Sequence, residues 1–429
     1  MRIVKLTNES RQDILTNLLK RNPGQYTEYE NVVNEILQNV RENGDEALFS
    51  YTEKFDHCKL DSKSVRVTEE EIEEAYASYD KDLVRIMQDA SANIIRYHEK
   101  QLTNSWIETK PDGTILGQKV TAIDTVGVYV PGGKAAYPSS TLMCILPAKV
   151  AGVNRIIMTT PCDAQGRVNP STLVSAKIAG VTEIYKVGGA QAIAAMAFGT
   201  ETVPKVDKIV GPGNIFVALA KKAVFGFVSI DSVAGPSEIL IIADETADPR
   251  YTAADLLSQA EHDQLASSIL ITTSEEFAKK VSAEVDRMTE KLPRREIIEA
   301  SLENYGYILV ADNMEDAIEA ANAIASEHME ILTENPFDIM TRIKNAGAIF
   351  LGPYSSEPLG DYYAGPNHVL PTNGTAKFFS PLGVDAFIKR TSIISYSKEA
   401  LLPVAEDIAR FADAEGLSAH AASIRIRKE

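Results

Sequence analysis

The sequence predicts an α/β protein made of two Rossmann-like units, each an open parallel sheet, with an N-terminal helical extension and a C-terminal helical tail. Three observations predict this class. From about Thr125, short apolar runs rich in β-branched residues alternate with helical patterns, as parallel strands and their crossover helices do. Two such series follow one another along the chain. Before residue 104 and after about Pro381, helical patterns prevail instead.

The first 103 residues are predicted to be helical. Apolar residues lie three and four positions apart in Asp13–Leu19 and in Tyr29–Val40. A further helix is expected to begin near Thr68, because Thr68 and Glu71 have the spacing of a capping box, and its pattern continues towards Gln101. We expect residues 1–103 to form a helical appendage.

The two α/β units are expected to divide the middle of the chain. We assign residues 128–236 to one unit, residues 104–127 and 237–380 to the other, and residues 381–429 to the tail. The first series of strands is expected at Val126–Val130, Arg155–Thr160, Glu183–Val187 and Lys208–Val210. The second is expected at Glu238–Ala243, Ser268–Thr273, Tyr307–Ala311 and Ala348–Leu351. Ligands of open sheets lie beyond the carboxyl ends of the strands, so we expect functional residues in the loops that follow.

Composition argues against several classes of protein. The chain has 429 residues, with 43 Lys and Arg against 60 Asp and Glu, and its net charge of −17 argues against a nucleic-acid partner. No run of roughly 18 apolar residues predicts a membrane span, and the polar N-terminus does not resemble a signal peptide. Three cysteines without a CxxC pair indicate neither a disulfide framework nor a thiolate metal site. We therefore expect a soluble, cytoplasmic protein.

Polar residues near the ends of predicted elements form a candidate metal site. Asp248 and Pro249 signal the start of a helix, near whose end Gln259 and His262 lie three positions apart on one face. The pair is either half of a metal site or an exposed polar helix end. Further donors occur in a glycine-bounded loop and around a glycine in the tail, at Asp361, His368, Glu415 and His420. Nitrogen and oxygen donors suit zinc first, and also manganese or cobalt.

The adjacent Glu327 and His328 are the best candidates for proton transfer. Histidine has an ordinary pKa of about 6.5, which suits general acid–base work. The alternative is a histidine that interacts with the dipole at a helix C-terminus. Cys144 and Cys162 have no neighbouring histidine or cationic cluster in the sequence, so we expect both in the core.

Three glycine-rich turns follow strands of the first series, at residues 130–133, 187–191 and 210–214. Glycine lets the backbone approach a phosphate or a ribose, and it also permits tight packing. The dinucleotide fingerprint G-x-G-x-x-G is absent, so spacing alone leaves both interpretations open. His57 and His98, in the helical region, are expected to be ordinary surface residues.

Taken in order, the motifs of the chain resemble those of histidinol dehydrogenase. They are VGVYVPGG (126–133), VGGAQAIA (187–194), GPGN (211–214), DSVAGPSE (231–238), LSQAEH (257–262), SEH (326–328), GDY (360–362), GPNHVLPT (365–372), SPLGVDAF (380–387) and EGLSAH (415–420). The resemblance spans nearly the whole chain. It implies a zinc-bearing homodimer that oxidises L-histidinol to L-histidine in two NAD-dependent steps through retained L-histidinaldehyde, the last reaction of histidine biosynthesis.

The resemblance also implies roles for individual residues. The zinc ligands, one ion per subunit, would be Gln259, His262, Asp361 and His420, with His420 delivered by the partner subunit's C-terminal tail. His328 would accept the alcohol proton, and Glu327 would help to activate the water that hydrates the aldehyde. The zinc ligands and His328 would border the substrate together with Ser237, His368 and Glu415. The NAD site would be lined by Tyr129, Gln191 and Asn214.

Other functions stay open on the sequence. One is a related zinc and NAD dehydrogenase that oxidises another polar alcohol. Glu415 and His368, expected to contact the amino and imidazole groups, favour histidinol over that alternative. The others are a metal-dependent hydrolase in which Glu327 serves as base, and a metal-binding protein without catalytic activity.

Overall fold

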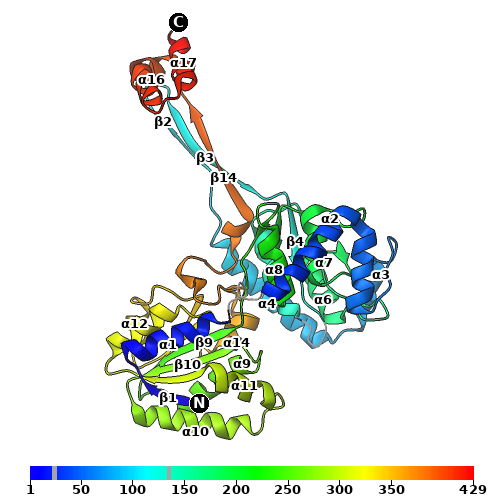
Figure 1. The fold of residues 1–429 in the computed structure, drawn as a ribbon, viewed down its shortest axis with the longest axis vertical. Coiled ribbons are helices and arrows are strands. Elements are labelled where there is room, and N and C mark those ends of the chain that lie inside the picture. The colour runs from blue at the N-terminus through cyan, green and yellow to red at the C-terminus, as the bar shows by residue number, and fades with distance from the viewer. Residues whose placement is uncertain (22–26, 133–136) are drawn as a thin grey trace.

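The computed structural model describes residues 1–21, 27–132 and 137–429. It confirms the predicted class, with two parallel sheets packed against helices and helical segments towards both ends of the chain. Figure 1 shows the two sheet-containing units next to each other and an antiparallel sheet that projects away from both. Gly133, part of the first predicted glycine-rich turn, lies outside the described residues.

The larger sheet has six parallel strands in the spatial order β1-β11-β10-β9-β12-β13. They are β1 (Arg2–Lys5), β9 (Glu238–Ala243), β10 (Ser267–Thr272), β11 (Gly306–Val310), β12 (His328–Leu332) and β13 (Ala348–Leu351). One face packs against α9 (Pro249–Ala260), α10 (Glu275–Thr289) and α11 (Arg295–Tyr305). The other packs against α1 (Asn8–Leu19), α12 (Met314–Ile324) and α13 (Pro336–Met340). Both faces are thus buried, which explains why the strands read as continuous apolar runs.

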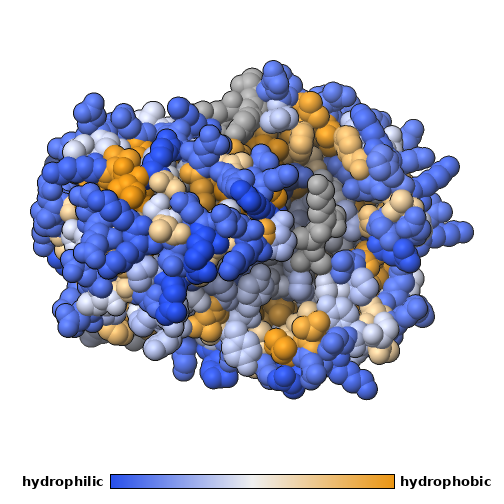
Figure 2. All heavy atoms as spheres, turned by 90° about the horizontal axis from the view of Figure 1, so that it is seen from below, coloured by the Kyte–Doolittle hydropathy of each residue, from blue (hydrophilic) through white to orange (hydrophobic). Residues whose placement is uncertain are grey.

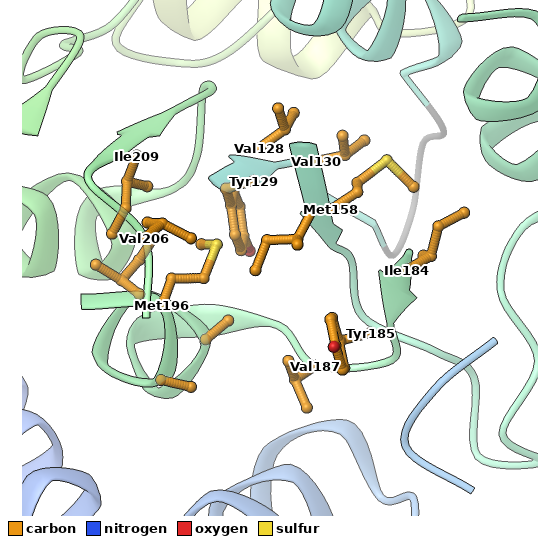
Figure 3. Close-up of a cluster of buried hydrophobic side chains, with 14 of the residues drawn as sticks. Val128, Tyr129, Val130, Met158, Ile184, Tyr185, Val187, Met196, Val206 and Ile209 are labelled. Carbon is orange, nitrogen blue, oxygen red and sulfur yellow. The ribbon is translucent and has the colours of Figure 1, made fainter. Parts of the chain in front are cut away.

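The smaller sheet has five parallel strands in the order β6-β5-β4-β7-β8. They are β4 (Thr125–Tyr129), β5 (Arg155–Thr159), β6 (Ile184–Tyr185), β7 (Lys208–Val210) and β8 (Ser229–Ile230). Its helices are α5 (Pro138–Val150), α6 (Pro170–Ala179), α7 (Gly189–Phe198) and α8 (Ile215–Val224). Figure 3 shows side chains of these strands meeting Met196 of α7 in the buried core.

The N-terminal helices are part of this second core and not an appendage. They are α2 (Thr27–Asp56), α3 (Glu69–Ser78) and α4 (Lys81–Glu99). α2 packs against α7 and α8, α3 against α6, and α4 against α5. The capping box of Thr68 and Glu71 is confirmed. His98 was expected at the surface, but its ring is buried in α4 and its Nδ1 lies 2.7 Å from the carbonyl oxygen of Ile94.

A three-stranded antiparallel sheet carries the C-terminal helices away from the two units, as Figure 1 shows. Its strands, in the order β14-β3-β2, are β14 (Ile388–Ser395), β3 (Ile115–Ala122) and β2 (Trp106–Thr109). The helices are α15 (Lys398–Leu401), α16 (Ala405–Ala414) and α17 (Ser418–Arg425). We call residues 104–122 and 388–429 together the arm. Most side chains of β2 and β14 are exposed, so the apolar alternation that reveals a half-buried strand is missing.

The strand pairing corrects the expected division of the chain at two places. Residues 2–5 were expected in the helical region but form β1, which pairs with β11 in the six-stranded sheet. Residues 104–127 were assigned to the same unit as residues 237–380. They form β2 and β3 of the arm and the start of β4, which belongs to the five-stranded sheet. These pairings join distant parts of the chain, which local patterns do not reveal.

On the face seen from below, Figure 2 shows mostly polar side chains with apolar patches between them. Within the described residues, no helix combines the length and the apolar character that a membrane crossing needs. Short 3₁₀ turns lie at Thr375–Lys377, Val384–Phe387, Leu402–Val404 and Ile426–Lys428. Cys144 and Cys162 are buried, as expected.

Candidate active site

The candidate catalytic pair lies at the amino edge of the six-stranded sheet. His328 is the first residue of β12, and Glu327 directly precedes it. The expectation that functional residues follow the carboxyl ends of strands is therefore wrong for this sheet. Because α9 runs back across the sheet after β9, Gln259, near its C-terminal end, also comes to this edge. In the five-stranded sheet the glycine-rich turns do follow strand ends, as predicted.

The His328 ring is held by the backbone of β9. Its Nδ1 lies 3.0 Å from the carbonyl oxygen of Glu238, which only accepts, so Nδ1 carries the hydrogen. The backbone N–H of Glu238 donates to Oε2 of Glu327 at 2.9 Å. One residue of β9 therefore holds both members of the pair, and the free ring atom of His328 is Nε2. Among the described residues, this buried Nε2 has no hydrogen-bond partner.

Several carboxylates surround His328. Its Nε2 lies 3.6 Å from Oδ1 of Asp361, and its Nδ1 lies 3.7 Å from Oε2 of Glu327. Burial alone would lower the pKa of His328, but the Glu327 and Asp361 carboxylates outweigh it and raise that pKa to about 10. Burial raises the pKa of Glu327 to about 8, and the neighbouring His328 opposes this. The two side chains thus compete for protons in a dry environment.

Asp361 lies on a single turn of π-helix, Gly360–Ala364, that follows the short helix α14 (Glu357–Leu359). One oxygen atom each of Asp361 and Glu357 and one nitrogen atom of His328 lie within 4.8 Å of one another, a spacing that suits a shared metal ion. Burial would raise the pKa of Asp361, but His328 and His368 outweigh it and lower that pKa. Asp361 is therefore held as a carboxylate, the form that binds a cation.

His368 connects the cluster to the five-stranded unit. Its Nδ1 donates to the carbonyl oxygen of Asp361 at 3.1 Å, and its Nε2 lies 3.1 Å from Oγ of Ser140 on α5. Burial lowers the pKa of His368. Asn367 Nδ2 also donates to the carbonyl oxygen of Met143 on α5, at 2.7 Å. The loop that carries Asp361 and His368 is thus fixed against both units.

Gln259 and His262 differ in their surroundings. Gln259 is fully buried near the end of α9, and neither its Oε1 nor its Nε2 has a partner among the described residues. His262 lies just beyond the helix and is exposed as a whole residue. Protein atoms around its ring nevertheless lower the pKa of His262, against the effect of the nearby Asp361 carboxylate. Ser237 directly precedes β9 at the same edge.

The structure does not bring the two expected tail residues to this cluster within one chain. Glu415 follows α16, and His420 lies on α17. Both are exposed, and Figure 1 places these helices at the far end of the arm, remote from the two sheets. The four expected zinc ligands therefore do not meet in a single subunit.

The expected NAD contacts lie around the turns at the carboxyl edge of the five-stranded sheet. The Tyr129 hydroxyl accepts from the Gly189 N–H at 3.2 Å, and burial raises the pKa of Tyr129 to about 12. Gln191 is buried in α7. Asn214 is the N-cap of α8, where its Oδ1 accepts from the N–H groups of Phe216 and Val217 at 3.1 and 3.2 Å.

A cavity of about 540 Å³ lies beside these turns, between α3 and α6. Its lining includes Gly132, Thr160, Pro161 and Cys162. Among the described residues that line it, none is Tyr129, Gln191, Asn214 or a member of the His328 cluster. The cavity is therefore separate from the expected contacts.

Comparison with known proteins identifies the family. The profile of the histidinol dehydrogenase family matches residues 19–428. The histidinol dehydrogenases of Clostridium acetobutylicum and Bacillus subtilis are 59% and 58% identical to the chain, over 91% and 94% of it and 90% and 93% of their own lengths. The chain belongs to the histidinol dehydrogenase family.

A crystal structure agrees with this assignment. Histidinol dehydrogenase from Elizabethkingia anophelis matches with a TM-score of 0.93 and 38% identity, covering 100% of this chain and 98% of that chain. As a member of the histidinol dehydrogenase family, the chain is an oxidoreductase. The resemblance read from the ordered motifs is thereby confirmed.

Sequence reasoning missed several polar residues that this family member buries beside the pair. Glu357 lies within the His328 cluster, and Glu330 on β12 accepts the Glu357 backbone N–H at 2.8 Å. Burial raises the pKa of Glu330 well above its ordinary value, and the nearby Asp255 carboxyl adds to this. An acidic residue inside an otherwise apolar run, as Glu330 is within Met329–Leu332, was the available signal.

Proposed function

We propose that this chain oxidises L-histidinol to L-histidine in two successive NAD-dependent steps, through L-histidinaldehyde that stays bound. The observation that carries the proposal is the placement of His328 between Glu327 and Asp361, in a chain of this family. The reaction would complete histidine biosynthesis. The three free cysteines agree with the reducing cytoplasm as its location.

His328 is proposed to accept the proton of the substrate alcohol. In the zinc-loaded protein the ion would offset the Asp361 charge that raises the pKa of His328, and the neutral ring would then keep its hydrogen on Nδ1, bound to the Glu238 carbonyl, and present a lone pair at Nε2. A base with one ring nitrogen tied down keeps a fixed orientation, which favours transfer to the other. Glu327 is proposed to take a proton from the water that hydrates the aldehyde before the second oxidation. Its carboxylate is oriented by the Glu238 N–H.

The donor set fits a zinc ion. Buried amide atoms without partners are costly, and a metal would satisfy Oε1 of Gln259. The residues that would hold it are Gln259, His262, Asp361 and His420 of the partner subunit. When bound, the ion would supply positive charge that orients the substrate and offsets the Asp361 charge beside His328. Ser237, His368 and Glu415 would contact the substrate.

The arm supports a homodimer with shared sites. It carries exposed apolar side chains, among them Ile394 at 73%, Phe411 at 72% and Ile426 at 61% exposure. An isolated, exposed arm of this composition is typical of a segment that packs against another chain. A second copy would bury these side chains and would bring Glu415 and His420 to the cluster of its partner.

The turns of the five-stranded sheet fit a dinucleotide. Within the described residues, the N-terminus of α7 has no side-chain cap, and the Gly189 N–H binds the Tyr129 hydroxyl, which leaves the N–H groups of the next residues for a phosphate oxygen. Tyr129, which binds the Gly189 N–H, Gln191 on the first turn of α7 and Asn214 at the N-cap of α8 are proposed to contact NAD. The nicotinamide would supply the hydride acceptor.

The decisive experiment measures stoichiometry with the purified zinc-loaded protein. We expect two NADH and one free histidine per histidinol consumed. One NADH with released aldehyde, or turnover of a different polar alcohol in a substrate panel with none of histidinol, would contradict the proposal. His328→Asn should lower kcat by about 100-fold or more while zinc content stays unchanged, because the base is lost and the expected ligands remain. Unchanged kcat in this variant would exclude His328 as the base.

Mixing two inactive variants tests the shared site. One carries His420→Ala and the other Glu327→Gln. After subunit exchange, each mixed dimer contains one site without a lesion, so about a quarter of the wild-type activity should return. If each site is built within one chain, the mixture stays inactive. Each variant incubated alone is the control.

A further inference from the structure

A buried arginine is tied to the residue that holds the candidate catalytic pair. Arg21 follows α1, and its side chain is 0% exposed. Its Nη2 donates to Oε1 of Glu238, whose own side chain is 3% exposed. Its Nη1 donates to the carbonyl oxygen of Leu265 at 2.9 Å, and its Nε donates to that of Leu18 at 3.3 Å. The guanidinium thus cross-links the end of α1, the loop before β10 and the start of β9.

Glu238 is the first residue of β9, where the strand ladder with β12 has not yet begun. The first paired residues are Ile239 and His328. On the side that faces β12, the backbone of Glu238 therefore binds side chains in place of a strand: its N–H binds Glu327 and its carbonyl oxygen binds His328. Nothing in the ladder itself fixes the position of these two backbone groups on that side.

Stability alone does not explain a charged pair at this position. Burying two charges costs about as much as their attraction returns, and apolar residues of similar size often replace such pairs without loss. An arginine fork that binds three separate segments does, however, fix the geometry of what it binds. The geometry fixed here is the backbone of Glu238.

We propose that Arg21 is a positioning residue for the reaction, acting through Glu238 on the orientation of Glu327 and His328. The inference rests on the proposed function. It gives the N-terminal strand and helix a role in catalysis, because β1 joins the six-stranded sheet and α1 packs on it, which brings Arg21 to the amino end of β9. Arg21 touches neither substrate nor cofactor in this scheme.

Four variants separate positioning from stability. Arg21→Met leaves the Glu238 carboxylate buried and unpaired, so both the melting temperature and kcat should fall. The double variant Arg21→Met/Glu238→Met removes both charges and should regain the melting temperature but not kcat. Arg21→Lys keeps the charge and loses the fork. The control is Arg11→Met on α1, whose partner Glu319 lies at the surface.

We expect kcat of the double variant and of Arg21→Lys to fall by about 10-fold to 100-fold, the usual effect of displacing a catalytic group by about 1 Å. The KM for NAD and the zinc content should stay within about twofold of wild type, since their proposed residues lie on other segments. Arg11→Met should leave all of these unchanged. A double variant with wild-type melting temperature and wild-type kcat would overturn the proposal. If the methionine variants do not fold, Arg21→Lys with native stability and unchanged kcat would overturn it equally.

A readout without turnover separates this inference from the proposed function. In protein labelled with ¹⁵N-histidine, the His328 signals are assigned by their loss in His328→Asn. In zinc-loaded protein, at a pH where these signals show a neutral ring, they should report a hydrogen on Nδ1 in the wild type and mixed tautomers in the double variant. A wild-type protein that does not oxidise histidinol refutes the proposed function alone, whereas an unchanged His328 tautomer in the double variant refutes the positioning role alone.

Discussion

Lys221 and Asp231 form a buried ion pair whose removal should strongly destabilise the five-stranded unit. Their side chains are 2% and 4% exposed. Lys221 Nζ also donates to the carbonyl oxygen of Gly211 at 2.9 Å, and Asp231 Oδ2 accepts from the Gly211 N–H at 2.8 Å. The pair therefore holds the turn at residues 211–214 from both sides. Lys221→Met keeps most of the side-chain volume and removes the charge.

The magnitude follows from the carboxylate that is left behind. Breaking a buried pair by removing one partner costs about 3–5 kcal/mol, because the remaining charge is uncompensated. Asp231 keeps two backbone N–H donors, from Gly211 and Ser232, and Lys208 lies near enough to interact with it. These contacts place the expected loss nearer to about 3 kcal/mol. Each kcal/mol lost lowers the melting temperature by about 2–4 °C, so the melting temperature of this unit should fall by about 6–12 °C.

Calorimetry and urea unfolding measure the effect, and the same helix supplies the control. Lys222 pairs with Glu30 at the surface, where its side chain is 49% exposed. Lys222→Met should therefore cost less than about 1 kcal/mol. Lys221→Met/Asp231→Leu, which removes both charges, should regain most of the loss. A Lys221→Met protein that melts within about 2 °C of Lys222→Met would refute the reasoning.

Three further predictions concern other positions of the same unit. Gly211→Ala should lower the free energy of unfolding by about 2 kcal/mol or more, because φ is +123° and the new Cβ would lie 2.0 Å from the Tyr129 carbonyl oxygen. A fall in the melting temperature of less than about 2 °C would contradict this. Asn214→Ala removes the cap of α8 and should lower the free energy of unfolding by about 1 kcal/mol, measured by urea unfolding. It should also raise the KM for NAD, and unchanged values of both quantities would contradict the two proposed roles of Asn214. Burial raises the pKa of Asp56 to about 6, and the nearby His57 opposes this shift. The folded state therefore holds this proton more tightly than the unfolded state, and the free energy of unfolding should fall as the pH rises from about 4 to about 6. Asp56→Asn should flatten that fall, and an unchanged pH profile would count against it.

Local patterns accounted for the elements that bury a continuous or periodic apolar face. β9 and β13 begin and end at the predicted residues, and α9 begins after the predicted cap at Asp248. The arm escaped prediction because β2 and β14 expose most of their side chains and so lack the alternation of a half-buried strand. β1 escaped because four residues at a chain end form a strand only through pairing with β11.

The candidate site was predictable as a set of residues but not as an arrangement. Ordered motifs pointed to Glu327, His328 and Asp361, and these three do cluster. The edge of the sheet was predicted wrongly. Functional residues were expected after the carboxyl ends of strands, but His328 is the first residue of β12 and lies at the amino edge. Glu357 carries no motif of its own, and only the turn of α14 brings it to the cluster.

The amino-acid order by itself determined the class of fold, the helix starts at Thr68 and Asp248, and the identity of most candidate site residues, because these depend largely on neighbours a few positions away. Folding in three dimensions decided which backbone groups orient them. Arg21 meets Glu238 across 217 positions of sequence, and Glu238 meets His328 across 90. Such contacts arise only when the sheet is assembled, since they depend on strand order and on where each ladder begins.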